Sequence, residues 1–155
     1  MMEQTVVLIR HGDAMGKALG QTDFERTLSD AGADALRAHF PRALSLVDVT
    51  DASELWVSTA VRARQTADIA NDTLGIEKVR ELDCMYAQDQ DAFLEELEAC
   101  TADVVVAVGH IPFMEDMCAT LCGQYLGFAT GAAAAVRINE FGRGRLEWFV
   151  QGPAV

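Results

Sequence analysis

The sequence predicts a layered α/β fold built on a mixed, mostly parallel β-sheet. Two observations predict it. Short apolar runs rich in β-branched residues alternate along the chain with longer segments of helical periodicity, which is the pattern of parallel strands joined by helices. The chain then closes on two strand-like segments separated by a glycine-containing turn, which adds an antiparallel hairpin.

Residues 5–9 (TVVLI) predict the first strand, because a short β-branched run is typical of strands buried on both faces. A helix is predicted to begin after Ser29, a suitable N-cap residue. Its apolar positions recur at helical spacing as far as Val47. Residues 54–58 (ELWVS) predict the second strand.

The next helix is predicted over residues 61–74, with Gly75 ending it, since glycine readily takes the left-handed conformation found after helices. Residues 77–81 predict a short strand. An amphipathic helix is predicted over residues 90–100, with Phe93 among its inward-facing residues.

The strongest strand prediction is residues 103–109 (DVVVAVG). Pro112 suits the first turn of a further helix that ends near Cys122, because a first-turn residue needs no backbone N–H. The two final strands and the turn between them are residues 132–139, 145–150 and 142–144.

The chain of 155 residues is predicted to form a single domain, 1–155, because no linker-like stretch divides it. Its four cysteines form no metal or disulfide pattern and are expected to be free thiols in a reducing cytoplasm. The segment Met1–Thr5 has no basic region, so no signal peptide is expected. No apolar run approaches the roughly 20 residues of a membrane helix. A cytoplasmic location is therefore predicted.

The formal charge of −12 limits the classes of partner that the protein is expected to bind. Nucleic acids and anionic membranes both favour a basic protein face, so neither is an expected partner. A monomer is the expected state.

Three segments follow the predicted strands at their carboxyl ends, namely residues 10–12 (RHG), 58–66 (STAVRARQT) and 109–112 (GHIP). If these strands are parallel, all three segments lie at one edge of the sheet, which is where open α/β sheets bind ligands. Two of the three histidines of the chain and two arginines then converge.

Such a set of side chains suits phosphoryl transfer. Arg10 and Arg62 can bind phosphoryl oxygens through bidentate, charge-assisted hydrogen bonds. A neutral His11 can attack phosphorus through one ring nitrogen while an acceptor holds the other, and a protonated His110 can donate to a phosphoryl oxygen. Gly12 permits a turn with positive φ or a close backbone approach. No metal or other cofactor is required, because the cationic side chains supply the charge.

The order of these motifs resembles the histidine phosphatase superfamily, and within it the short SixA-type phosphohistidine phosphatases. The resemblance covers most of the chain and implies a three-layer α/β/α, phosphoglycerate mutase-like fold. The segments that carry it are 10–14 (RHGDA), 26–32 (RTLSDAG), 58–66 (STAVRARQT) and 109–113 (GHIPF).

By this resemblance His11 is the nucleophile that becomes phosphorylated, and Arg10, Arg62 and His110 form the phosphate site with it. Arg26 is a candidate for the rim of that site, and with Gly12 it is a candidate substrate-binding residue. The larger relatives carry insertions that cover the site. A chain of this length has little to spare for a lid, so an open site is expected.

One departure from the family pattern concerns the acid that protonates a leaving alcohol. Ile111, which is not an acid, follows the second histidine. Asp13, Glu81 and Asp83 are candidates, and the sequence does not choose among them. A weak or absent acid slows ester cleavage, but it matters less for a phosphoramidate, whose imidazole leaves readily once it is protonated.

The leading hypothesis is a phosphatase that removes phosphate from phosphohistidine on a protein through a covalent phosphohistidine intermediate. The alternative is a phosphomonoesterase or mutase-like enzyme acting on a small phosphorylated metabolite, phosphoserine or phosphothreonine. A noncatalytic phosphate-sensing module is a third reading, which the presence of both histidines and both arginines opposes.

Overall fold

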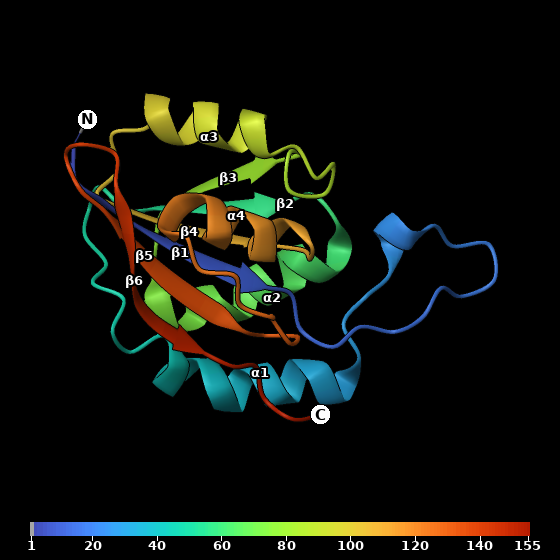
Figure 1. Ribbon diagram of the computed structural model, residues 1–155. Coiled ribbons are helices and arrows are strands. Elements are labelled where there is room, and N and C mark those ends of the chain that lie inside the picture. Colours follow the sequence, from blue (N-terminus) through green and yellow to red (C-terminus); the bar gives the residue numbers. More distant parts are fainter. Residues whose placement is uncertain (1) are drawn as a thin grey trace.

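The computed structural model describes residues 2–155, which form a six-stranded sheet in the order β3-β2-β4-β1-β5-β6 (Figure 1). β1 is parallel to β4, and β2 is parallel to both β3 and β4, whereas β5 is antiparallel to β1 and β6. The mixed, mostly parallel sheet is therefore confirmed. The strands are β1 (Gln4–Arg10), β2 (Glu54–Ser58), β3 (Lys78–Leu82), β4 (Val104–Gly109), β5 (Ala133–Ile138) and β6 (Gly144–Val150).

Helices cover both faces of this sheet. α1 and α2 lie on one face and α3 and α4 on the other, so the three-layer α/β/α architecture is confirmed (Figure 1). Among residues 2–155 no helix is both long and apolar enough to cross a membrane. The helices are α1 (Asp30–Ala43), α2 (Val61–Leu74), α3 (Gln90–Ala99), α4 (Phe113–Cys122) and the short 3₁₀ helix η1 (Asp23–Glu25).

Alternation along β1 divides the core into two clusters. Val6 and Leu8 face α3 and α4, while Val7 and Ile9 face α1 and α2, and all four side chains are fully buried. Burying an aliphatic side chain of this size stabilises a fold by about 1.5–3 kcal/mol. The core therefore holds the carboxyl end of β1, where Arg10 lies, between two packed layers.

Most element boundaries agree with the sequence signals, and two differ. α1 begins after Ser29, whose hydroxyl accepts the Gly32 N–H, but it ends at Ala43. The apolar spacing continues to Val47 because the chain goes on in tighter turns, with Val47 N–H donating to the Leu44 carbonyl at 3.1 Å. Pro112 immediately precedes the first turn of α4 and is not part of it.

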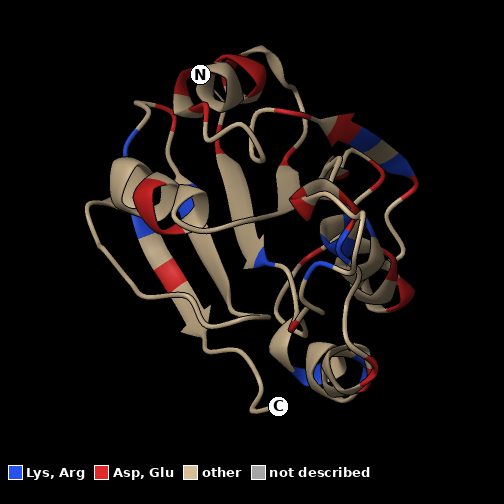
Figure 2. Cartoon of the chain, turned by 90° about the vertical axis from the view of Figure 1, so that its right-hand side faces the viewer, with Lys and Arg blue, Asp and Glu red and all other residues tan. Residues whose placement is uncertain are grey.

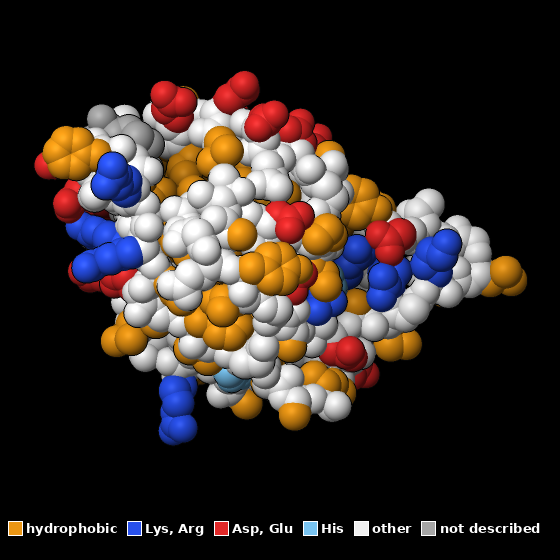
Figure 3. All heavy atoms as spheres, in the orientation of Figure 1, with side chains coloured by type: hydrophobic (Ala, Val, Ile, Leu, Met, Phe, Trp, Pro, Cys, Tyr) orange, Lys and Arg blue, Asp and Glu red, His pale blue; other side chains and the backbone are white. Residues whose placement is uncertain are grey.

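The carboxyl ends of β1, β2 and β4 meet at one edge of the sheet, toward the viewer in Figure 2. Beside this edge stands a projection that we call the arm, residues 14–28, which links β1 to α1 and includes η1. The arm extends away from the body at the right of Figures 1 and 3, and basic side chains gather where it leaves the body (Figure 3). The arm flanks the site even though the chain is short.

Candidate functional site

The strand register brings the predicted catalytic residues together. Arg10 pairs with Gly109 across β1 and β4, and the His11 N–H donates to the Gly109 carbonyl at 2.9 Å. The rings of His11 and His110 therefore lie close, with their centroids 5.3 Å apart. Arg62, in the first turn of α2, reaches the same point, with its Nε 3.3 Å from His11 Nε2.

His11 has a defined orientation. Its Nδ1 lies 2.8 Å from the Gly12 carbonyl oxygen, which can only accept, so Nδ1 carries the proton and Nε2 carries the lone pair. That lone pair faces the Arg62 Nε–H. Burial of His11, which is 8% exposed, and the positive charges of Arg62, Arg10 and Arg26 lower its pKa to about 4. The imidazole is therefore neutral at pH 7.

Gly12 supports His11 through a close approach of other elements, and its φ is not positive. A Cβ on Gly12 would lie 2.6 Å from Leu36 Cδ1 on α1. The Gly12 N–H donates to Thr66 Oγ1 at 3.0 Å, and the Thr66 hydroxyl donates to the Arg62 carbonyl at 2.8 Å. The Gly12 amide is thus occupied by α2, and the contribution of Gly12 visible here is the carbonyl that holds His11.

The guanidinium of Arg62 is held at three points. It is 6% exposed, and besides its contact with His11 it donates from Nη1 to the Asp23 carbonyl at 2.7 Å. Its Nη2 lies 3.1 Å from Asp23 Oδ2. Asp23 occupies the outer end of the guanidinium, which leaves the Nε edge directed at His11.

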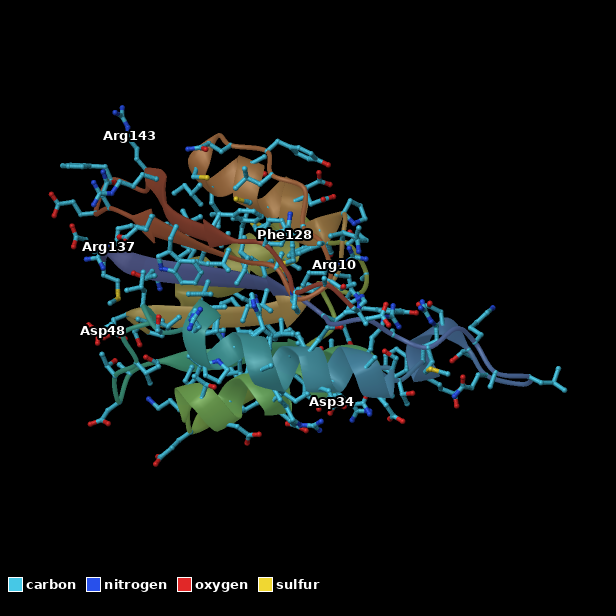
Figure 4. The ribbon with its side chains drawn as sticks, turned by 90° about the horizontal axis from the view of Figure 1, so that it is seen from below. Arg10, Asp34, Asp48, Phe128, Arg137 and Arg143 are labelled. Carbon is cyan, nitrogen blue, oxygen red and sulfur yellow. The ribbon has the colours of Figure 1, made fainter. Side chains whose placement is uncertain are left out.

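Arg10 and Arg26 are the other two arginines whose charges act on His11. Arg10 Nη1 donates to the Phe128 carbonyl at 2.9 Å, and the two residues lie together at the carboxyl end of β1 in Figure 4. Arg10 Nε is buried, with no hydrogen-bond partner among the described residues. Arg26 donates from Nε to the Met15 carbonyl at 2.7 Å and from Nη1 to Asp23 Oδ1 at 3.0 Å. The positive charges of Arg10, Arg26 and Arg62 therefore all act on His11.

His110 differs from expectation in its charge. Burial, followed by the charges of the neighbouring His11 and Arg62, lowers the pKa of His110 to about 3. His110 is therefore neutral in this site, whereas the sequence led us to expect it to be protonated. Its Nε2 lies 2.7 Å from Ser58 Oγ, and its buried Nδ1 has no partner among the described residues. When the Ser58 hydroxyl donates to Nε2, the neutral ring carries its proton on Nδ1 and remains a donor.

Two residues of the site escaped the sequence reasoning. The Asp23 carboxylate contacts Arg26, Arg62 and the Tyr86 hydroxyl, the last at 3.0 Å, and the hydrogen bond from Arg26 is the main reason that its pKa falls to about 2. The Tyr86 ring packs edge-on against His110, with centroids 5.3 Å apart. The spacing of Asp23 and Arg26, three residues apart, was a signal for an ion pair, whereas no motif pointed to Tyr86.

The three candidate acids are held by other partners. Asp13 Oδ2 accepts from the Ser29 hydroxyl at 2.7 Å, at the start of α1. The other two carboxylates are exposed. Glu81 lies 3.9 Å from Arg64 and Asp83 accepts from the Thr59 hydroxyl at 2.9 Å. Arg64 is itself half exposed, as its place two residues beyond Arg62 on α2 predicts.

The positive charge of the site comes from its arginines. Among residues 2–155 no group of three or more His, Cys, Asp or Glu side chains is arranged to hold a metal ion. The arrangement combines a neutral imidazole with a free lone pair, a second imidazole and three guanidinium groups, which together can receive a phosphoryl group and stabilise its negative charge.

The chain is similar to known proteins over most of its length. The chain is 28% identical over 152 residues to phosphohistidine phosphatase SixA of Escherichia coli (strain K12), covering 92% of this chain and 91% of that protein. The fold resembles the protein histidine phosphatase SixA solved with tungstate, with a TM-score of 0.77 and 27% identity over 96% of this chain and 97% of the other. It also resembles an Agrobacterium tumefaciens protein assigned to SixA, with a TM-score of 0.81 and 29% identity over 95% and 97% of the two chains.

The family model of the histidine phosphatase superfamily (branch 1) matches residues 6–86, more than half of the chain. This match contains most of β1 and all of the arm, α1, β2, α2 and β3. The phosphoglycerate mutase-like fold expected from the sequence is the fold of the structural relatives. The chain belongs to the histidine phosphatase superfamily and is a phosphatase of that type.

Proposed function

We propose that the chain removes the phosphoryl group from phosphohistidine on a protein, through a covalent intermediate on His11. The observation that carries the proposal is the state of His11. Its Nδ1–H is held by the Gly12 carbonyl, its Nε2 lone pair is free of protons, and burial keeps its pKa near 4. A neutral, oriented imidazole is a competent nucleophile at neutral pH.

The proposed reaction has two steps. In the first, His11 Nε2 attacks phosphorus, the bond between phosphorus and the substrate imidazole breaks, and the departing imidazole keeps a proton taken from solvent. In the second, water attacks the phosphoryl group on His11, which releases inorganic phosphate and restores the neutral ring. Arg10, Arg62 and Arg26 stabilise the charge of the transferred group, and His110 donates from Nδ1.

The carboxylates around the site favour a phosphoramidate over an ester. The carboxylate nearest to the arginines belongs to Asp23, whose pKa of about 2 makes it a poor acid at neutral pH. Asp13, Glu81 and Asp83 are engaged elsewhere. An alkoxide needs a proton as it leaves, whereas an imidazole protonated by solvent does not. The relatives named phosphohistidine phosphatases support the same choice.

The setting that we propose is a monomer in the cytoplasm acting on a phosphorylated protein. The four cysteines are unpaired in the structure, as expected where thiols stay reduced. The formal charge of −12 opposes self-association, nucleic acids and anionic membranes.

The test is a substrate panel run with two histidine variants. We expect the protein to hydrolyse a phosphohistidine protein, to turn over phosphate esters slowly, and to retain ³²P after an acid-free quench. His11→Ala should lose the label and the activity. His39→Ala changes the remaining histidine of the chain, which lies on α1, and should keep both. Fast turnover of a small ester with none on phosphohistidine contradicts the proposal.

The esterase alternative has its own signature. If an acid does act on an ester, one of Glu81→Gln, Asp83→Asn or Asp13→Asn abolishes ester hydrolysis while phosphate still binds. Equal ester hydrolysis by all three variants and the unaltered protein removes this alternative.

A further inference from the structure

The outer part of the arm, residues 15–22, which we call its tip, exposes apolar side chains near the site. Leu19 is fully exposed, and Met15 is 55% exposed. Residues 14–22 (AMGKALGQT) contain no acid, and their one charge is Lys17, although the chain has 24 Asp and Glu residues. Other large apolar side chains are exposed as well, but the tip combines two of them with a lone positive charge next to the site.

The base of the arm is tied to the site. Ala14 and Leu28 form an antiparallel bridge, and the Met15 N–H donates to the Thr27 carbonyl at 2.8 Å. Arg26 binds the Met15 carbonyl, and the backbone and side chain of Asp23 both hold Arg62. These bonds hold the base of the arm at the site, so the tip begins next to the arginines around His11.

We propose that the tip of the arm is the docking surface for the protein that carries the phosphorylated side chain. The inference rests on the proposed function and adds the surface at which the phosphorylated protein binds. The matching partner surface is an apolar patch with a carboxylate near Lys17, next to the phosphorylated residue. A small metabolite bound at His11 does not extend to the tip, which stands clear of the body in Figure 3.

The net charge of the chain argues against a second copy of it as the occupant of the tip. Two copies would each bring a formal charge of −12. A partner that delivers a phosphoryl group to His11 must come close to the arginines at the base of the arm, and a folded domain doing so meets the tip as well.

The experiment compares two substrates that carry the same phosphohistidine. One is a folded protein domain phosphorylated on a surface histidine with phosphoramidate. The other is a short peptide containing the same phosphohistidine. The variants are Leu19→Ser and Lys17→Glu, with Phe141→Ser as the matched control, because Phe141 is 80% exposed in the turn between β5 and β6.

We expect the unaltered protein to prefer the folded domain. Leu19→Ser should raise KM for that domain about tenfold, the usual effect of losing one well-placed contact, with kcat and all peptide kinetics unchanged. Lys17→Glu should act in the same direction and more strongly at low salt. Phe141→Ser should change nothing.

Three results overturn the proposal. Equal losses on domain and peptide would show that the arm acts on the site and not on the partner. Unchanged kinetics on every folded domain would show that the tip makes no contact. A dimer that Leu19→Ser dissociates would assign the surface to a second copy. If neither substrate nor phosphoramidate itself is hydrolysed, the proposed function has failed, and this inference fails with it.

Discussion

At the scale of single residues, Asp23 is the side chain whose position needs an explanation. It places a carboxylate against Arg26 and Arg62, the cations that would receive a phosphoryl group. Its contacts with both Nη atoms of Arg62, through Oδ2 and the backbone carbonyl, orient the Nε–H toward His11. The same negative charge opposes the binding of an anion, so Asp23 aligns Arg62 at some cost in phosphate affinity.

This balance predicts the effect of Asp23→Asn. The amide keeps the shape and one acceptor but removes the charge, so inorganic phosphate should bind about fivefold more tightly, a change on the order of 1 kcal/mol. The inhibition constant of phosphate measures this effect. Asp34→Asn is the control, because Asp34 also pairs with an arginine three residues away, Arg37, at 3.1 Å, but on the outer surface of α1. An equal change in both variants would contradict a local effect of Asp23.

At the scale of elements, the glycine of the RTLSDAG segment is explained by how α1 docks. Gly32 lies in the first turn of α1, and a Cβ there would be 2.3 Å from the Asp13 carbonyl oxygen. That carbonyl accepts the Ser29 N–H at 2.9 Å, so the start of α1 lies directly against the segment that follows His11. Any larger side chain must push this backbone away from the site.

Gly32→Ala should therefore lower the free energy of unfolding by about 1–3 kcal/mol, the usual cost of overpacking. Urea denaturation measures it. Gly16→Ala on the arm is the matched control, since a Cβ there has nothing within 4 Å and a change of less than about 0.5 kcal/mol is expected. If Gly32→Ala lowers the free energy of unfolding as little as Gly16→Ala does, the helix relaxes around the new methyl group and the prediction is wrong.

At the scale of the whole molecule, the two buried histidines link stability to pH. Burial lowers the pKa of His11 to about 4 and that of His110 to about 3, whereas both titrate near 6.5 in an unfolded chain. Between these values the unfolded chain binds protons that the folded chain does not, so stability rises with pH and is lost as pH falls below about 6.5. The lowered pKa of Asp23 acts in the same direction only at lower pH, since it falls to about 2.

His110→Gln should therefore weaken the pH dependence of stability. Each such histidine contributes at most about 1.4 kcal/mol per pH unit, so the slope between about pH 6 and pH 4.5 should fall by roughly that amount. Urea denaturation across this range gives the slope. Lys17→Gln serves as the control, because it changes an exposed side chain and leaves both buried histidines in place. Identical slopes in His110→Gln and the unaltered protein would show that His110 is protonated in the folded state.

Local signals in the sequence predicted the elements and the central residues of the site. The β-branched run at the start of β1 and the glycine after α2 mark their elements because strand burial and helix termination depend on a few adjacent residues; Gly75 takes φ +68°. The carboxyl ends of parallel strands lie at one edge of the sheet. That rule was enough to predict that the side chains that follow three of these strands, Arg10, His11, Arg62 and His110, lie together.

The tertiary structure decided what lies between those residues. Asp23 meets Arg62 across 39 positions and Tyr86 across 63, and no local pattern encodes contacts of that range. The neutral state of His110 depends on burial and on neighbouring charges, which exist only once the layers have packed. The sequence by itself therefore determined which groups are available for phosphoryl transfer. Their protonation, their orientation and the arm beside them arise from long-range packing, because each depends on atoms far away along the chain.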